Sequence, residues 1–322
     1  MKPHYCLATV TSETFVTGTE VLLYSFLKCN PWFDGDIVII IDTLSKQAKA
    51  RLSDLYPVIF KTRGAVVEQK IVLLRQKVPE LRADLHLRLL SLEVFLLSGY
   101  HKVVFLDSDG LCTGNLLEMF EHPSQLAAAN DGFGYEDLID PMLEKLGKKT
   151  ISTKDRYGKK ILENTFNSGS MAIAAELLSE KTYLAVTELL GDFQIWNDFG
   201  VKGFTDQMLL NIHFSQQTTR LDGRYNFMPY MESYIKCVDG ISLIDAKFVH
   251  FAGRIKPWFK FDWQQLLVYA PQYIKYLQLW LDVWQELRSK DKPELLAEKI
   301  QSQFDWMEGG NDAKITQLGV YE

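Results

Sequence analysis

Short apolar runs alternate with amphipathic segments along residues 1–110 of this chain. The apolar runs are rich in Val, Ile and Phe, which is typical of strands that are buried on both faces of a sheet. The pattern predicts strands at 5–10, 36–41, 58–61 and 102–106, and helices at 16–27, 44–55 and 85–97. This alternation indicates βαβ units, so the predicted fold class is α/β with a mainly parallel sheet.

The middle of the chain is less regular. An apolar run at 126–130 ends in Asn130-Asp131, and residues 131–160 are rich in glycine and charge, with one amphipathic piece near 138–146. We expect this stretch to be a mobile excursion that covers a substrate. The later pattern predicts a polar turn at 167–170 before an apolar run, helices at 176–190 and 205–214, and a short strand at 248–251.

The apolar pattern of the C-terminal region predicts long helices. Residues 263–287 carry Leu, Tyr and Trp at spacings of three and four, and a second helix is expected at 294–304. An apolar stripe of this kind either packs on the rest of the protein, forms a homodimer or lies on a membrane surface. Few Lys or Arg residues precede Arg288, which favours core packing or a dimer and leaves membrane association at most peripheral.

Composition limits the classes of binding partner and the cellular compartment that we expect. The chain has 322 residues and a net charge of −6, without a Lys/Arg stripe, which argues against a nucleic-acid partner. Its four cysteines have no C-x-x-C spacing, so a zinc site or a disulfide framework is not expected, and a reducing compartment is favoured. Neither a signal-peptide pattern nor an uncharged apolar run long enough to span a bilayer is found, so we expect a cytoplasmic protein.

Two carboxylates follow the strand at 102–106 directly, in the tripeptide Asp107-Ser108-Asp109. Side chains at i and i+2 of an extended segment point the same way, so both carboxylates can face one hard cation. A divalent cation held in this way can grip a diphosphate. The alternative is an Asp-Ser-Asp turn that closes the strand with capping side chains, and the tripeptide alone leaves both interpretations open.

A second group of chemically capable residues lies between His250 and Trp258. A histidine at a strand end supplies a neutral imidazole ligand. Mn²⁺ accepts mixed oxygen and nitrogen ligands, whereas Mg²⁺ prefers oxygen. Gly253 lets the backbone come close to a phosphate, and Lys256 supplies a point charge for its oxygens. Taken singly, His250 is equally a hydrogen-bonded histidine at a sheet edge, and Lys256 a solvated lysine.

The spacing His-x-x-Gly-x-x-Lys-Pro-Trp, after an upstream strand and Asp-x-Asp, resembles glycosyltransferase family 8, the group of glycogenin, galactinol synthase and bacterial lipopolysaccharide galactosyltransferases. The resemblance covers residues 4–262. Asn167-Ser168-Gly169 matches the family segment beside the donor sugar, and Asp206-Gln207 followed by Asn211 matches "DQxxLN". His101 stands where the family commonly has Asp.

The resemblance implies a GT-A fold, with a mixed, mainly parallel sheet flanked by helices and a helical C-terminal extension. It also implies a retaining transfer of a hexose from a UDP-sugar to an acceptor hydroxyl, with Mn²⁺ or else Mg²⁺. The first guess for the acceptor is a glycan or glycoconjugate, and a protein hydroxyl or a small polyol comes next. The implied domains are a catalytic domain at 1–262, with a nucleotide-binding half at 1–110 and a sugar and acceptor half at 111–262, and an extension at 263–322.

The resemblance further implies three sets of functional residues. The metal ligands are Asp107, Asp109 and His250. The residues at the reacting centre are Asp206, Gln207 and Lys256. The donor-binding residues are Thr9, Thr11, Ser12, Phe15, Arg88, Ser108, Asn130, Asp131, Asn167, Ser168, Gly169, Gly253 and Lys256.

Gln207 is implied to lie closest to the anomeric carbon, and an amide is a poor nucleophile. We therefore expect the acceptor to attack from the side of the leaving group, with a leaving phosphate oxygen taking its proton.

Two rival functions remain at this point. The run Asp107-Ser108-Asp109-Gly110 resembles the signature of haloacid-dehalogenase-like phosphatases, although that signature normally follows the first strand of its domain and leaves the segment 250–258 unexplained. The second rival is a non-catalytic scaffold that binds nucleotide sugars.

Overall fold

A computed structural model describes residues 3–78, 84–145, 165–192, 195, 205–253, 255–259 and 271–289. The chain divides into two units, one ending at Trp258 and the other beginning at Phe259. The predicted boundary at residue 262 and the division at residue 110 remain predictions.

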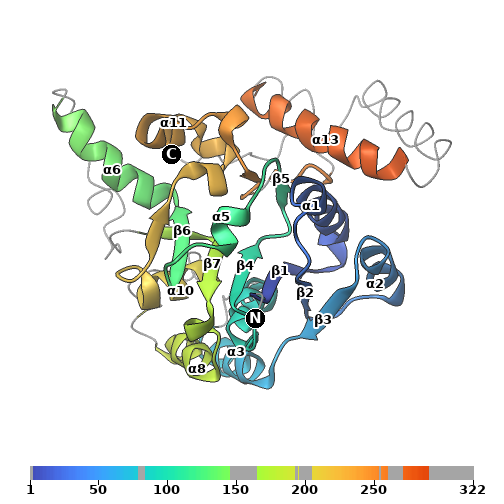
Figure 1. Cartoon of the computed structure of the whole chain (residues 1–322). Coiled ribbons are helices and arrows are strands. Elements are labelled where there is room, and N and C mark those ends of the chain that lie inside the picture. The colour runs from blue at the N-terminus through green and yellow to red at the C-terminus, as the bar shows by residue number, and fades with distance from the viewer. Residues whose placement is uncertain are drawn as a thin grey trace, which may run out of the picture. The chain divides into compact units, whose positions relative to one another are not determined.

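A seven-stranded mixed sheet forms the centre of the first unit (Figure 1). Its strands, in spatial order, are β3 (Val58–Thr62), β2 (Asp36–Ile41), β1 (Tyr5–Thr11), β4 (Lys102–Leu106), β7 (Phe166–Ala174), β6 (Leu126–Asn130) and β8 (Thr219–Leu221). The first four strands are parallel, β7 is antiparallel to both of its neighbours, and β8 is parallel to β6. The predicted α/β class with a mixed, mainly parallel sheet is confirmed.

A small second sheet joins two distant parts of the chain. It consists of β5 (Gly110–Cys112) and β9 (Phe248–His250), which run antiparallel with Gly110 opposite His250. Phe248 packs so tightly against Gly110 that a Cβ there would come within 2.1 Å of its ring. The glycine after the Asp pair therefore allows β9 to lie directly beside it.

Helices cover both faces of the main sheet (Figure 1). The α-helices among the described residues of the first unit are α1 (Val16–Cys29), α2 (Lys46–Ser53), α3 (Ala65–Lys77), α4 (Leu85–Arg88), α5 (Leu117–Phe120), α6 (Gly132–Lys145), α8 (Glu180–Glu188), α10 (Asp206–Phe214) and α11 (Glu232–Asp239). The 3₁₀ helices in the same described parts are η1 (Glu13–Phe15), η2 (Leu90–Leu96), η3 (Ala175–Leu177), η4 (Leu189–Gly191), η6 (Gly223–Tyr225), η7 (Pro229–Met231) and η8 (Leu243–Asp245).

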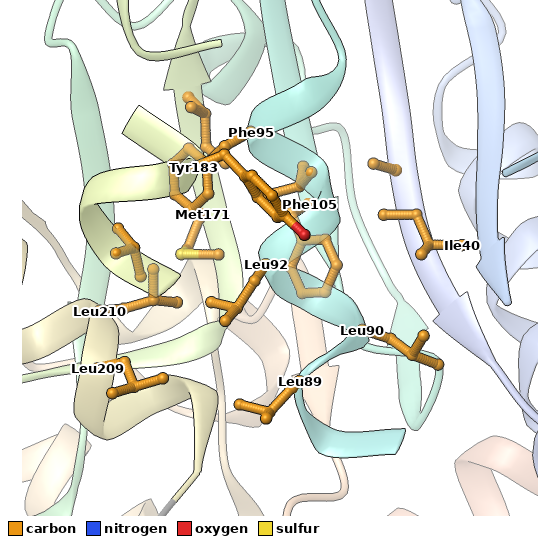
Figure 2. Packing of buried hydrophobic residues seen from close by; sticks show 14 of the residues in the cluster. Ile40, Leu89, Leu90, Leu92, Phe95, Phe105, Met171, Tyr183, Leu209 and Leu210 are labelled. Carbon is orange, nitrogen blue, oxygen red and sulfur yellow. The ribbon is translucent and has the colours of Figure 1, made fainter. Parts of the chain in front are cut away.

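Alternate residues of each central strand face two separate hydrophobic clusters, as the period of two in a strand requires. On β4, Val103 and Phe105 pack with α3, η2, α8 and α10, whereas Val104 and Leu106 pack with α1, α2 and α5. Figure 2 shows the first cluster, in which η2 inserts Leu92 and Phe95 beside the sheet. Both faces are buried, so β2 and β4 are apolar after their first residue.

The structure corrects several predictions. The single helix predicted at 85–97 is instead α4 followed by the 3₁₀ helix η2, with the break at Leu89, where ψ is 0°. The helix α3 was not predicted, because Val72 and Leu73 are about half exposed and obscure its apolar face. The helix predicted at 176–190 is divided into η3, α8 and η4. The short strands β5 and β8 were not predicted.

The polar turn predicted at 167–170 is wrong, since these residues continue β7 and are buried. The side chains of Asn167, Ser168 and Ser170 bond other side chains or backbone groups. The amphipathic piece predicted at 138–146 belongs to α6, which begins earlier, at Gly132. The rest of the predicted excursion, from residue 146 to 160, lies outside the described residues.

The second unit is described at Phe259 and at 271–289, where η9 (Pro271–Tyr273) precedes α13 (Ile274–Ser289). The first residues of the predicted 263–287 helix and the helix predicted at 294–304 lie outside the described residues. In the parts of the chain that the structure covers, none of the helices combines the length and apolarity of a membrane span.

Candidate metal centre

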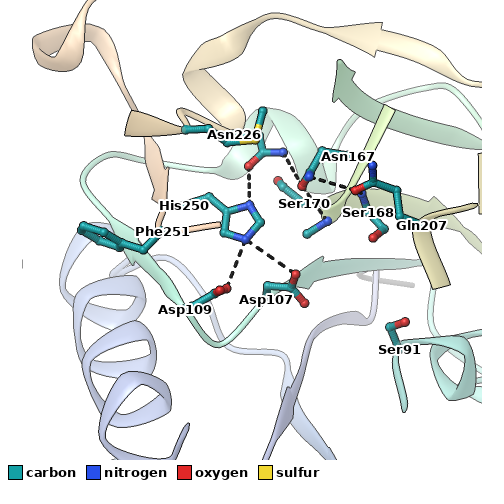
Figure 3. A network of polar contacts seen from close by, with 12 residues as sticks. Ser91, Asp107, Asp109, Asn167, Ser168, Ser170, Gln207, Asn226, His250 and Phe251 are labelled. Carbon is teal, nitrogen blue, oxygen red and sulfur yellow. Dashed lines mark hydrogen bonds and ion pairs between the residues drawn. The ribbon is translucent and has the colours of Figure 1, made fainter. Parts of the chain in front are cut away.

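Asp107, Asp109 and His250 come together at the carboxyl end of β4. His250 Nε2 lies 3.1 Å from Asp109 Oδ1 and 3.6 Å from Asp107 Oδ2 (Figure 3). One ligand atom from each residue lies within 4.8 Å of the other two. The pairing of β5 with β9 produces this arrangement, because it brings His250 beside the residue that follows Asp109.

The two carboxyl groups have different electrostatic environments. Burial and the charge of Asp109 raise the pKa of the Asp107 carboxyl to about 7. Burial would also raise the pKa of Asp109, but the Lys256 ammonium and the His250 ring outweigh it and hold that pKa below its usual range. A raised pKa indicates negative charge that the protein itself does not fully compensate. Two carboxylate oxygens and one imidazole nitrogen therefore fit a divalent ion such as Mn²⁺.

Gly169 on β7 provides the space for these ligands. A Cβ on this residue would come within 2.2 Å of His250 Cε1 and 2.8 Å of Asp107 Oδ2. The backbone N–H of Asp107 also donates to Gly169 O at 2.8 Å. The glycine of the Asn-Ser-Gly segment is thus in direct contact with two of the three candidate ligands.

Lys256 contacts the carboxylate oxygen of Asp109 that His250 does not contact. Its ammonium forms an ion pair with Asp109 Oδ2 and donates to Phe251 O at 2.6 Å. Two residues further on, Trp258 Nε1 donates to Thr14 O at 2.9 Å, and the indole fills the space left by Gly18. The described part of the 251–258 segment is thereby attached to the start of α1. Gly253 has a φ of +93°, which favours glycine.

A second polar group joins β6, β7 and α10. Gln207 Oε1 accepts from Asn167 Nδ2 at 2.9 Å, and Gln207 Nε2 donates to Asp131 Oδ2 at 3.0 Å. Asp206 Oδ2 accepts from the Ser168 hydroxyl at 3.1 Å. The structure thus brings together the residues that the sequence singled out at 131, 167–168 and 206–207.

Two further residues in this group were missed. Asn226 is fully buried and follows η6; its Oδ1 lies 2.9 Å from His250 Nδ1, and its Nδ2 donates to Asn167 Oδ1 at 2.9 Å. Ser91 donates to Asp206 Oδ2 at 2.7 Å. These partners are far apart in the sequence, and neither residue stands in a pattern that indicates a site, so only the folded chain reveals them.

The residues expected to contact the nucleotide lie near the carboxyl end of β1, the strand next to β4. Thr9 is fully buried, and its hydroxyl has no hydrogen-bond partner among the described residues. The hydroxyls of Thr11 and Thr19 are 2.7 Å apart. The Phe15 ring packs edge-on against Trp258, with 5.4 Å between the ring centroids.

Three other predicted donor-binding residues have less distinctive surroundings. Arg88 Nε donates to Asp84 at 3.1 Å, and the Arg88 charge partly offsets the burial that raises the pKa of Asp206. Ser108 and Asn130 are buried. Donor binding by all of these residues remains a prediction.

Comparison with known proteins identifies the family. The sequence model of glycosyl transferase family 8 matches residues 6–262, which is most of the chain. Glycogenin of Neurospora crassa is 23% identical over 252 residues, which cover 77% of this chain and 30% of that protein. Mouse glycogenin-1 is 29% identical over 183 residues, which cover 55% of this chain and 43% of that protein. The matches thus span less than half the length of these curated relatives.

A solved structure of the galactosyltransferase LgtC, in complex with donor and acceptor sugar analogues, has the same fold. The TM-score is 0.61 at 14% identity, and the alignment covers 87% of this chain and 95% of LgtC. The predicted GT-A fold is therefore confirmed, and the phosphatase alternative loses its basis. With a family match over most of its length, this chain belongs to glycosyl transferase family 8.

Proposed function

We propose that this chain transfers a hexose from a UDP-sugar to an acceptor hydroxyl, with retention of the anomeric configuration and with Mn²⁺ as the cofactor. Mg²⁺ is the second candidate. Membership of the family supports this proposal, and one observation carries it: Asp107, Asp109 and His250 converge at the carboxyl end of a central strand. Open α/β sheets bind their ligands at that edge.

The three converging residues would hold the ion through two carboxylate oxygens and His250 Nε2. When bound, the ion supplies positive charge that neutralises the diphosphate and the negative charge that develops on the leaving UDP. The Lys256 ammonium forms an ion pair with one of these carboxylates, that of Asp109, so it is our choice for a further charge on the diphosphate.

The hydrogen bonds of Gln207 support front-face attack. Both ends of its amide are engaged, because Oε1 accepts from Asn167 and Nε2 donates to Asp131. Such an amide is well suited to form one wall of the sugar site and poorly suited to act as a nucleophile. Asp206, held by two serine hydroxyls, is assigned to orient sugar hydroxyls. A covalent sugar trapped on Asp206 or Gln207 and seen by mass spectrometry would overturn this mechanism.

The acceptor that we propose is a glycan or a glycoconjugate, with a protein hydroxyl as the second candidate. The scattered cysteines and the absence of a basic stripe favour a cytoplasmic protein with no nucleic-acid partner. We further propose that the apolar stripe of the C-terminal helices supports a homodimer.

Release of UDP from a panel of UDP-sugars, measured with Mn²⁺ present, tests this function. The wild-type chain should release UDP from at least one UDP-sugar, by hydrolysis or by sugar transfer. The combined Asp107→Ala, Asp109→Ala variant should release none. The matched control is Glu180→Ala with Glu188→Ala, which removes the same charge from positions on the surface of α8 and should keep full activity. Binding of donors without turnover by the wild type would favour a non-catalytic scaffold.

A further inference from the structure

A chain of hydrogen bonds begins at His250, on the side of its ring that faces away from Asp107 and Asp109 (Figure 3). Its first link joins His250 Nδ1 and Asn226 Oδ1 at 2.9 Å, and its second runs from Asn226 Nδ2 to Asn167 Oδ1, also at 2.9 Å. From Asn167 the chain continues through Gln207 to Asp131, by the two bonds described above. Three side-chain amides thus connect an imidazole to a carboxylate.

The backbone of β7 fixes the direction of this chain. Asn167 Oδ1 accepts from the Gly169 backbone N–H at 3.0 Å, and a backbone N–H can only donate. The oxygen of the Asn167 amide must therefore occupy this position, and Asn226 must present its NH₂ group to it. The Asn226 oxygen then faces His250. If the Asn226 amide were rotated by 180°, its oxygen would face the Asn167 oxygen, and two acceptors would be in contact.

This direction determines the state of the His250 ring. Because Asn226 Oδ1 is an acceptor, Nδ1 of His250 must carry a hydrogen. In a neutral ring the other nitrogen, Nε2, then has the lone pair, and Nε2 is the atom that faces Asp107 and Asp109. Asn226 and His250 are 0% and 2% exposed, so water does not compete for these positions.

The other end of the chain agrees with this direction. Gln207 Oε1 accepts from Asn167 Nδ2 and, at 3.4 Å, from the Ser168 backbone N–H, so Nε2 faces Asp131. The second oxygen of Asp131 accepts from the Gly134 backbone N–H at 2.8 Å and from the Thr165 hydroxyl. Backbone donors at Asn167 and at Gln207 therefore specify one orientation for every amide.

We propose that Asn226 is a positioning residue that selects the metal-binding tautomer of His250. Asn167 is the fixed point that orients it. This proposal rests on the metal centre of the proposed function. A group hydrogen-bonded to the far nitrogen of a metal-bound histidine fixes both the tautomer and the orientation of the ring, and its loss typically weakens metal binding by about 10- to 100-fold.

The test is the dissociation constant for Mn²⁺, measured by calorimetry on the full-length chain without any donor. Asn226→Ala removes the acceptor and should weaken binding by about 10- to 100-fold. Asn226→Asp keeps an oxygen toward Nδ1 but loses the donor to Asn167, so it should bind Mn²⁺ at least as tightly as the wild type even where its melting temperature falls. Val186→Ala, a buried substitution on α8, controls for lost stability and should leave the constant unchanged.

A spectroscopic readout separates tautomer selection from general loosening of the site. Nitrogen NMR of the six histidine side chains, with Zn²⁺ as a diamagnetic probe, should show Nδ1 of wild-type His250 protonated and Nε2 bound to the ion. Equal Mn²⁺ affinity of the wild type and Asn226→Ala, or a proton on Nε2 in the Zn²⁺ form, would overturn the role of Asn226. If the wild type binds no Mn²⁺ at all, the metal centre of the proposed function is wrong and this inference falls with it.

Discussion

The cluster of Figure 2 and the polar group of Figure 3 are built from the same strands, yet different forces fix their side chains. On β7, Met171 and Ile173 pack into the hydrophobic cluster, whereas Asn167 and Ser168 bond polar side chains on α10. The hydrophobic cluster is stable when its side chains fill the available volume, since dispersion and burial have no preferred direction. The polar group is stable only when each donor lies opposite an acceptor. Substitutions that keep volume but exchange oxygen for nitrogen should therefore separate the two regions.

The largest expected effect on stability is in the hydrophobic cluster. Leu92 is fully buried on η2, so Leu92→Ala should lower the free energy of unfolding by about 2–5 kcal/mol through lost burial and the cavity left behind. Leu92→Met keeps the volume and should cost less than about 1.5 kcal/mol. Denaturant titration measures both. Folded Leu92→Ala should bind Mn²⁺ like the wild type, and weaker binding would mean that the two regions are not independent.

The matching effect in the polar group falls on activity. Asp109→Asn keeps the shape of the side chain but replaces a proposed ligand oxygen and removes the charge that pairs with Lys256. UDP release should fall by about 10²- to 10³-fold, the loss typical when one group that stabilises developing charge is removed. Retained activity in a variant whose circular dichroism is unchanged would show that Asp109 is not a metal ligand.

Exchanging polarity at one link sharpens the comparison further. Gln207→Glu places two acceptors face to face at Asp131, and Asp131→Asn leaves too few acceptors there, so each should cost about 1–3 kcal/mol of stability. The double variant restores a donor at position 131 opposite an acceptor at position 207. A double-mutant cycle from thermal unfolding should therefore show the two changes partly cancelling. Strictly additive losses would indicate that this bond is unimportant for the fold.

The smallest expected effect is a gain in stability. The pKa of Asp107 is raised to about 7 in the folded chain from an ordinary value of 3.8, so its ionisation disfavours the metal-free fold. This cost is absent below about pH 4 and complete above about pH 7. Asp107→Asn should thus raise the melting temperature of the metal-free protein by a few degrees at pH 8 and leave it unchanged near pH 4. An equal rise at both pH values would place its cause outside this titration.

Apolar pattern was enough to predict the core of the fold. The strands β1, β2 and β4 were predicted to within a residue at each end because they are buried on both faces and therefore mostly apolar. The helix α3 was not predicted because its exposed face carries apolar residues. β7 was predicted as a turn where it is polar, because sequence periodicity cannot distinguish polar residues that meet water from polar residues that meet buried partners.

The candidate site shows the same division. The two aspartates stand at strand spacing, and His250 stands in a family motif, so the sequence indicated all three. Asn226 and Ser91 take part through partners that are distant in the sequence. Asn226 bonds His250, 24 residues away, and Asn167, 59 residues away, and Ser91 bonds Asp206, 115 residues away. Hydrogen-bond direction is a property of the folded site, and a linear pattern does not encode it.

The convergence of Asp107, Asp109 and His250 on one divalent ion is the central claim. Crystals soaked with Mn²⁺ and UDP, measured at the manganese absorption edge, test it most directly. We expect one strong anomalous peak in contact with both carboxylates, with His250 Nε2 and with the diphosphate. An anomalous peak bound elsewhere, or none at these three residues in a chain that still releases UDP, would contradict the account.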